Sequence, residues 1–269
     1  MNDFLPLVAY FIIYSFIGWV LESTYKSVLQ KKWVNSGFLH GPICPIYGYG
    51  AMIMYLSLRN LTNNIFILFW FGLIVLSAFE YVVGWLLEIT FKTKYWDYSR
   101  KMFNIHGRVC LQNSLYWGIL GVVFMKLIHP SIERVFGIIP DQYVLIIVSS
   151  ASTIIIVDTI ITVIGLVKIN IKLKNLEEIT AAIKDRMTAI NIKNVVNLEK
   201  IKQFQLRNNQ KILDKIGAIR NSESVLGELK KRQEYYHKTL EKRLRRLKRA
   251  FPSMNSERLS KFLNNEKKS

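Results

Sequence analysis

The chain has 269 residues, of which 51% are hydrophobic, and a net charge of +18 that is unevenly distributed along it. Residues 1–167 hold 11 Lys and Arg against 8 Asp and Glu, whereas residues 168–269 hold 26 against 11. With only two cysteines, a scaffold held by several disulfides is excluded, and we expect an apolar transmembrane domain over residues 1–167 followed by a basic cytoplasmic helical tail over residues 168–269.

Five apolar runs in the first part approach the roughly 20 residues that a helix needs to cross about 30 Å of hydrocarbon. They are residues 4–21, 43–58, 65–89, 111–128 and 142–167. Lys and Arg gather in the loops after the first and third runs and in the tail, and cytoplasmic loops are enriched in both. The sequence therefore predicts an all-α polytopic membrane protein with about five transmembrane helices, its N-terminus outside and its C-terminus inside.

Two stretches of the chain are similar to each other. Residues 18–44 read GWVLESTYKSVLQKKWVNSGFLHGPIC and residues 84–110 read GWLLEITFKTKYWDYSRKMFNIHGRVC, and nine aligned positions are identical. Chance would give about two identities at ordinary residue usage. We interpret the similarity as an internal duplication, with repeat 1 over about 8–58 and repeat 2 over about 74–125. Each copy carries two predicted spans, so the copies are parallel, a plan found in transporters that work at the repeat interface.

Acidic residues occur at two depths of the predicted spans. Glu22 and Glu88 occupy equivalent positions near the cytoplasmic ends of their helices, where a carboxylate reaches water or simply marks a helix end. Glu80 and Asp158 interrupt apolar segments, where an ionisable group costs roughly 2.5–3.5 kcal/mol and usually faces a bundle interior or a watery cavity. The alternative for these two is a buried ion pair or a hydrogen bond to a neighbouring helix.

We expect a polar substrate cavity at the cytoplasmic side, although no catalytic residue is identified. Its candidate lining residues are Glu22, Glu80, Glu88, Trp96, Asp97, Tyr98, Asn104, Arg108, Asn113 and Asp158.

Residues 37–50, GFLHGPICPIYGYG, contain two prolines and four glycines where the second span begins. Irregular backbone at membrane depth persists only where it is buried in protein or lines a cavity. The composition therefore predicts a broken or re-entrant start of the second span. The residues of this motif are Gly37, Gly41, Pro42, Pro45, Tyr47 and Gly48.

The spacing H-x-x-x-C occurs in both copies of the duplication. Four such ligands would suit tetrahedral zinc if the copies met at their axis. Each group could equally cap a helix or pack in the core, so no metal site is favoured. The residues concerned are His40, Cys44, His106 and Cys110.

Four stretches carry a resemblance to a known family: GFLHGPICPIYGYG, GWLLEITF, YWDYS and FNIHGRVCLQNSLYWG. Over roughly residues 4–165 the chain resembles the putative ABC-transporter type IV (CmpB-like) family of bacterial integral membrane proteins. The resemblance implies a membrane permease or permease subunit in the bacterial cytoplasmic membrane. The chain lacks the G-x-x-x-x-G-K-[ST] phosphate loop, so we expect no cofactor in this chain, with ATP bound only by a separate cytoplasmic ATPase partner.

The tail has apolar residues at helical three–four spacing in two blocks, residues 173–190 and 236–251. This spacing predicts coiled-coil or helical-hairpin packing and offers a surface for homo-oligomers. The spacing breaks at residues 217–224, GAIRNSES, where we expect a turn. The densest basic run, KRLRRLKRAF at residues 242–251, suits anionic lipid headgroups or a protein partner better than nucleic acid.

Three functions are compatible with these features. We favour a permease or permease subunit that moves a small solute, and the intramembrane acids favour a cation or a zwitterion. A membrane-anchored scaffold or sensor would instead act through the tail. An enzyme acting on a lipid headgroup would use Glu88 or Asp97 as base and Arg108 and Asn104 to hold a phosphate. The sequence has no recognisable catalytic signature, so we favour a non-enzymatic role and keep the lipid-headgroup enzyme as an alternative.

Overall fold

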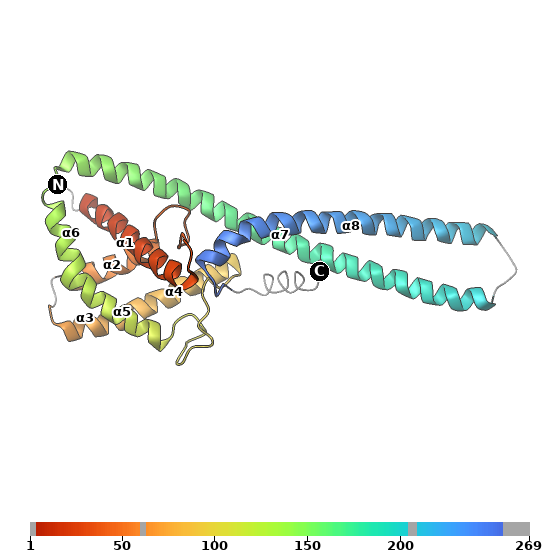
Figure 1. The fold of residues 1–269 in the computed structure, drawn as a ribbon, viewed down its shortest axis with the longest axis horizontal. Coiled ribbons are helices and arrows are strands. Elements are labelled where there is room, and N and C mark those ends of the chain that lie inside the picture. Colours follow the sequence, from red (N-terminus) through yellow and green to blue (C-terminus); the bar gives the residue numbers. More distant parts are fainter. Residues whose placement is uncertain (1–3, 60–62, 204–208, 255–269) are drawn as a thin grey trace. The chain divides into compact units, whose positions relative to one another are not determined.

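The computed structural model describes residues 4–59, 63–203 and 209–254, and within these ranges the chain is helical (Figure 1). The same ranges hold no strand beyond an isolated bridge between Ile105 and Val109. The predicted all-α class is therefore confirmed for the described residues.

The chain divides into two compact units. The first comprises residues 4–167 together with residues 246–254, and the second comprises residues 168–245. The first boundary follows residue 167, where the apolar part of the sequence ends. Residues 246–254, which we expect in the tail, belong instead with the first unit, because Leu247 and Ala250 are buried there.

Four helical stretches of the described chain are long and apolar enough to cross a membrane. They are α1 (Phe4–Gln30); the continuous run of α3 (Ile65–Phe71), η1 (Gly72–Leu76) and α4 (Ser77–Phe91); the continuous run of α5 (Leu111–Val123), η2 (Phe124–Ile128) and α6 (His129–Phe136); and Gln142–Thr188 within α7 (Asp141–Gln203). They correspond to the first, third, fourth and fifth predicted runs, and by length and composition they are candidate membrane spans.

The second predicted run forms α2 (Pro45–Leu58), which has only 14 residues. At 1.5 Å per residue it rises about 21 Å, short of the roughly 30 Å hydrocarbon core. The reason is the path of residues 31–44, which run back along α1 without helix or strand, so that the Cys44 N–H donates to the Ser15 carbonyl oxygen at 2.9 Å. Thus α2 begins beside the middle of α1, and the described residues supply four full-length spans and one short helix rather than five comparable spans.

Glycines let the helices of the first unit pack closely. A Cβ atom on Gly48 of α2 would lie 2.1 Å from Ser15 Oγ and 2.8 Å from the Phe11 carbonyl oxygen of α1. A Cβ atom on Gly72 of η1 would lie 3.1 Å from the Trp117 carbonyl oxygen of α5. Small residues at such contacts are typical of membrane bundles, where close backbone approach provides much of the attraction between helices. These contacts seat α2 against α1 and η1 against α5.

The core of the first unit is rich in aromatic side chains. Its buried members are Tyr10, Tyr14, Met54, Leu58, Leu68, Leu76 and Phe124. His129 is buried beside them, and the Tyr14 hydroxyl lies 2.5 Å from His129 Nδ1. This hydrogen bond gives each of the two polar side chains a partner within an otherwise apolar bundle.

The second unit pairs the C-terminal part of α7 with α8 (Asn209–Ala250). Its buried apolar residues are Leu173, Leu176 and Ile183 of α7 and Leu240 and Leu244 of α8. Gln233 Nε2 of α8 donates to Thr180 Oγ1 of α7 at 3.1 Å. The predicted turn at residues 217–224 is wrong, because α8 continues through them. A glycine or serine inside a helix costs at most about 1 kcal/mol, which a 42-residue helix with an apolar face outweighs.

Candidate functional site

Three segments meet at one end of the first unit, which we call the loop end. They are residues 31–44, residues 92–110 and residues 246–254, the last of which we call the strap. Lys26 Nζ of α1 donates to the Ala250 carbonyl oxygen of the strap at 2.5 Å. The ring of Phe251 lies 5.1 Å from the ring of Tyr95, centroid to centroid. The strap therefore packs against α1 and against the second loop.

The strap contains part of the basic run that we expect to bind lipid headgroups. One of its cations is committed to the protein, because Arg246 donates to the Leu39 carbonyl oxygen of the first loop. Burial lowers the pKa of this guanidinium, and the nearby Asp158 opposes the shift. Binding of anionic lipid by the rest of the run stays a prediction.

Glu80 lies at the centre of a cluster that also contains Tyr98, Asn113 and Trp117, which we call the Glu80 group. Its carboxyl group is buried, with the residue only 5% exposed. Trp117 Nε1 donates to Glu80 Oε2 at 2.9 Å, and the Tyr98 hydroxyl donates to Glu80 Oε1 at 3.4 Å. Asn113 donates to the Tyr98 hydroxyl oxygen at 2.6 Å and also bonds Glu80. Residues from α4, the second loop and α5 thus converge on one carboxyl group.

The donors around Glu80 are all uncharged. Burial, and after it the neighbouring Glu80, raise the pKa of the Tyr98 phenol, so Tyr98 keeps its proton and remains a donor. Within the described ranges no Lys, Arg or His forms an ion pair with Glu80. A buried carboxyl group held only by neutral donors lacks the charge partner that such groups usually have.

Glu22 lies close to the Glu80 group but is already neutralised. Lys26 Nζ lies 2.7 Å from Glu22 Oε1, and the Tyr47 hydroxyl donates to Glu22 Oε2 at 2.6 Å. The Tyr47 ring lies 5.6 Å from the Trp117 ring. Tyr47 and Trp117 therefore connect the two acidic groups through a contact between their tilted rings.

Glu88 and Arg108 form an ion pair of their own. Arg108 donates to Glu88 Oε2 through both Nε, at 3.0 Å, and an Nη atom, at 2.8 Å. Its other Nη donates to the Tyr81 hydroxyl at 3.2 Å, and the guanidinium carbon lies 5.2 Å from the Tyr81 ring centroid. Trp96 Nε1 donates to the Arg108 carbonyl oxygen at 2.8 Å. This arrangement fixes the second loop to α4 and leaves Arg108 fully engaged.

Asp158 of α7 binds the first loop. Its carboxylate accepts the Gly41 N–H at 2.8 Å and the His40 N–H at 3.2 Å, and His40 Nδ1 lies 3.2 Å from the same carboxylate. A Cβ atom on Gly41 would lie 3.2 Å from Asp158 Oδ2, so a glycine suits this close approach. Asp158 therefore holds residues 31–44 against α7.

Asp97 and Asn104 shape the second loop from within. Asp97 Oδ1 accepts the Ser99 N–H at 3.0 Å and the Ser99 hydroxyl at 2.5 Å. Asn104 donates to the carbonyl oxygens of Ser99 and Lys101 at 3.2 and 2.9 Å and accepts the Gly107 N–H at 3.1 Å. These hydrogen bonds lie within the second loop and stabilise its turns. None of them joins Asp97 or Asn104 to Glu80.

Three of the four residues weighed as zinc ligands have other partners, and the fourth, Cys110, is a buried free cysteine. His40 bonds Asp158, His106 Nδ1 lies 3.1 Å from the Tyr81 hydroxyl, and Cys44 Sγ donates to the Ser36 carbonyl oxygen at 3.9 Å. Burial raises the pKa of the Cys44 thiol to about 12, which disfavours the thiolate that binds metal. In the described part of the chain no three His, Cys, Asp or Glu side chains gather closely enough to hold a metal ion.

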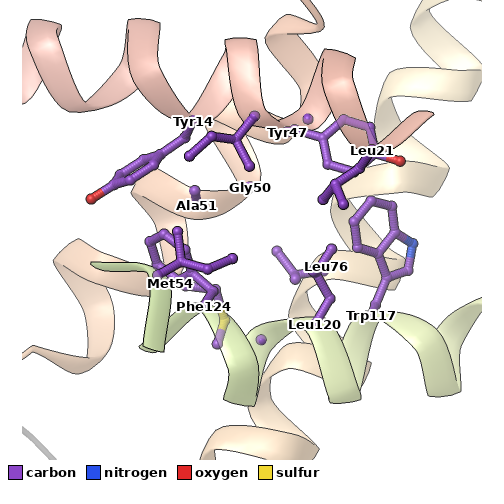
Figure 2. Close-up of a pocket in the computed structure, with 14 residues that line it drawn as sticks. Tyr14, Leu21, Tyr47, Gly50, Ala51, Met54, Leu76, Trp117, Leu120 and Phe124 are labelled. Atoms are coloured by element: carbon purple, nitrogen blue, oxygen red, sulfur yellow. The ribbon is translucent and has the colours of Figure 1, made fainter. Parts of the chain in front are cut away.

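An apolar cavity of about 50 Å³ lies directly beside the Glu80 group, among α1, α2, η1 and α5 (Figure 2). In Figure 2 the rings of Tyr47 and Trp117 lie together at one side of the cavity, and Tyr14, Met54 and Phe124 lie at the other. Gly50 and Leu76 also line it. Tyr47 and Trp117 line the cavity, while the Tyr47 hydroxyl donates to Glu22 and Trp117 Nε1 donates to Glu80, so each of these two residues adjoins both the apolar cavity and one acidic side chain.

Only some of the candidate cavity residues from the sequence lie close together in the structure. Glu80, Tyr98 and Asn113 lie together, and Glu22 joins them through Tyr47. Trp117 is absent from that set although it is a direct partner of Glu80. Its position four residues after Asn113, on the same face of α5, is the signal that could have found it.

The sequence model of the family described as "Putative ABC-transporter type IV" matches residues 9–163 of the chain, more than half of its length. The resemblance carried by the four motif stretches is therefore confirmed over nearly the range that they indicated. Neither the curated proteins nor the solved structures give a match to the chain.

Proposed function

We propose that this chain, which belongs to the putative ABC-transporter type IV family, is a membrane permease or permease subunit that moves a small cation past the loop end of its first unit. The family is transport-related, and the proposal adds which part of the chain handles the solute. The observation that carries it is Glu80, a buried carboxyl group whose hydrogen-bond partners are all neutral.

Glu80 differs from the neighbouring acidic residues because each of those has a basic partner. Glu22 is paired with Lys26, Glu88 with Arg108 and Asp158 with His40. A buried charge without a partner is costly, and intramembrane acids typically mark a solute or ion pathway. A transported cation would supply the missing charge and then leave, which a permanent Lys or Arg partner would prevent. The three neutral donors would hold the carboxyl group in place while no cation is bound.

We further propose that the loop end faces the cytoplasm, with the N-terminus outside and the C-terminus inside. The loops at this end carry most of the Lys and Arg of the first unit. Residues 31–44 and the short α2 together return the chain from the loop end toward the start of α3, so successive segments alternate in direction (Figure 1). The membrane that we propose is the bacterial cytoplasmic membrane.

Two features support the parallel duplication as part of this proposal. The helical runs that lead to the two loops, Phe4–Gln30 and Ile65–Phe91, each have 27 residues. Cys44 and Cys110, which occupy equivalent positions in the two copies, are each buried and each directly precede the helix that leaves the loop end. The two copies then meet beside the Glu80 group, because the ring of Tyr47, from the first copy, lies 5.6 Å from the ring of Trp117, a partner of Glu80 in the second.

An energy source for transport has to come from elsewhere, because the chain has no phosphate-binding loop of the Walker type. A separate ATPase would bind from the cytoplasm, and the loop end and the second unit are the surfaces offered to it. This partner is a proposal that rests on the family and on the orientation.

A scaffold or sensor role is the second candidate, favoured by the two long helices of the second unit, which form a compact unit of their own. Replacing residues 175–238 by a short flexible linker removes most of that unit and keeps the strap. If flux survives while a cellular phenotype of the gene is lost, the tail carries a separate role. If flux is lost as well, the tail serves transport.

The proposed function is tested by flux into everted membrane vesicles from cells that express the chain at its native locus, so that any partner is present. Uptake of labelled small cations, both inorganic and organic, is measured with and without ATP for the wild-type chain and for Glu80→Gln. Glu133→Gln, which makes the same change at an exposed position of α6, is the control. We expect a chain-dependent flux that Glu80→Gln abolishes and Glu133→Gln preserves. A chain-dependent flux that is equal in all three would refute the role of Glu80.

A further inference from the structure

We propose that the two loops of the loop end bind an anionic phospholipid surface, with their apolar tips at the level of the headgroups and their cations on the lipid phosphates. The tips are residues 31–33, Lys-Lys-Trp, which we call tip 1, and residues 100–103, Arg-Lys-Met-Phe, which we call tip 2. Each tip has two consecutive cations followed by large apolar side chains. This surface is separate from the Glu80 group and from the basic run at residues 242–251.

The apolar side chains of both tips are exposed on the protein. Trp33 has 72% of its surface exposed, Phe103 has 74% and Met102 has 79%. The cations of both tips are exposed as well. Exposed apolar side chains bordered by polar ones mark contacts with a protein or with a membrane. The helices on which the tips lie decide between these two.

Tip 2 lies on the side of α5 that faces the lipid. Lys101 Nζ donates to Gln112 Oε1 at 3.3 Å, and Gln112 Nε2 donates to the Tyr116 hydroxyl at 3.0 Å. Gln112 and Tyr116 belong to an exposed face of α5 that continues with Leu115 and Ile119. Because α5 is part of a candidate span, the exposed apolar part of this face meets hydrocarbon. The second loop therefore brings Lys101 back over the lipid-facing side of α5.

Tip 1 has the same relation to α1. The Trp33 ring makes a T-shaped contact with the Trp19 ring at 6.2 Å, and the Trp19 ring stacks on the Phe16 ring at 5.8 Å. Phe16 is exposed, so the three rings form a row along the outer face of a candidate span. Tryptophan is enriched where spans meet the headgroups, because its ring is apolar and its N–H is polar. The row places Trp33 at that level.

The shape of tip 2 is fixed by hydrogen bonds. Asn104 donates to the carbonyl oxygens of Ser99 and Lys101, which holds the turn. Phe103 has a φ of 50°, a left-handed conformation that bulky residues rarely adopt. An apolar side chain that is held away from the protein in such a conformation indicates a contact outside the chain.

The charge of the tips favours anionic lipid. Neither tip contains an acidic residue. Arg100 is exposed, and the Lys101 ammonium has three N–H donors, of which one is used for Gln112. Long cationic side chains keep their charge in the headgroup region while their stems lie on apolar surface, and anionic headgroups attract them there. A protein partner would have to reach the sides of α1 and α5, which lipid covers, so lipid is the better occupant.

The first test places a tryptophan reporter at tip 2 of the purified full chain in vesicles. Phe103→Trp is compared with Tyr235→Trp, which adds a reporter at an exposed position of α8, a helix outside the candidate spans. The fluorescence gained over the wild-type chain is measured with phosphatidylcholine brominated on its acyl chains, which quenches a ring that it touches. We expect quenching at position 103 and none at position 235. Equal quenching at both positions, or quenching at position 103 by aqueous iodide alone, would overturn the proposal.

The charge of tip 2 is tested in the same Phe103→Trp chain. Quenching by brominated phosphatidylglycerol relative to brominated phosphatidylcholine gives the preference for anionic lipid at this place. Arg100→Gln/Lys101→Gln should lower that preference by about fivefold for each cation removed. Lys230→Gln/Lys231→Gln, which removes two adjacent exposed cations from α8, should leave it unchanged. An unchanged preference in the tip 2 variant would overturn the role of anionic lipid.

Trp33 tests tip 1 without an added side chain, and it keeps the proposal testable if Phe103→Trp does not fold. The emission that Trp33→Phe removes should be emission that brominated lipid quenches in the wild-type chain. If brominated lipid leaves that emission unquenched, tip 1 does not lie in the lipid and the proposal is overturned. None of these measurements depends on transport, so their outcome is separate from the flux test of Glu80.

Discussion

The contact between α1 and α2 can be tested by adding a single methyl group at Gly48. A Cβ atom there would lie 2.1 Å from Ser15 Oγ and 2.8 Å from the Phe11 carbonyl oxygen, whereas ordinary contact begins at 3.4 Å. The Ser15 hydroxyl can rotate away, but the Phe11 carbonyl belongs to the helix backbone and cannot. Gly48→Ala therefore requires α2 to move from α1 by at least about 0.6 Å, the difference between 3.4 and 2.8 Å.

The expected cost is about 1–3 kcal/mol of unfolding free energy, the range found for overpacked interiors. Gly165→Ala provides the matched control, because its new methyl group meets nothing within 4 Å and a helical Gly→Ala change alone stabilises by up to about 1 kcal/mol. Reversible unfolding of the two variants in mixed detergent micelles, followed by circular dichroism, gives the difference. Equal stability of Gly48→Ala and Gly165→Ala would show that α2 does not lie against α1 in this way.

Two further predictions concern the loop end. Arg108→Ala leaves Glu88 without its partner, so it should lower the unfolding free energy of the chain by about 1–3 kcal/mol. In a double-mutant cycle, the double variant Glu88→Gln/Arg108→Ala should recover part of that loss. Additive losses of the two single variants would contradict the ion pair. Burial raises the pKa of the Cys44 thiol from 9.0 to about 12, so in a Cys110→Ser background Cys44 should resist N-ethylmaleimide at pH 7.5 until the protein is unfolded, and rapid labelling of the native chain would contradict the burial. Because the folded state holds this proton more tightly, the stabilisation it gives is complete below pH 9 and is lost as the pH rises toward 12.

The helical class and the long spans were predictable because apolar runs of about 20 residues have few alternatives in a membrane. The length of α2 was not, because hydropathy says how apolar residues 43–58 are and not how far residues 31–44 run back along α1 before the helix begins. The Cys44–Ser15 hydrogen bond that sets this start joins backbone groups and has no side-chain signature.

The candidate site was predictable as a set of polar residues and not as a set of pairs. The depth of Glu80 in an apolar segment identifies it from the sequence alone. That Arg108 binds Glu88 rather than Glu80 depends on where the second loop returns to α4, and that Asp158 binds Gly41 depends on how α7 passes the first loop. The strap was missed for the same reason, because residues 246–254 follow a long helix whose path the amino-acid pattern does not give.

The turn expected at residues 217–224 shows the opposite weakness. Gly217 and the serines after it are weak helix formers, so the local sequence pattern predicts the end of a helix there. Inside α8 the small local cost is outweighed by the many helical residues on either side.

Cation flux through membranes that contain the Glu80→Gln variant tests the central claim most directly. The measurement compares this variant with Glu133→Gln at equal amounts of folded protein in everted vesicles. The account predicts that flux falls at least tenfold in Glu80→Gln and is unchanged in Glu133→Gln, because only Glu80 is a buried acid that lacks a cationic partner in the described chain. Chain-dependent flux that is undiminished in Glu80→Gln would contradict it.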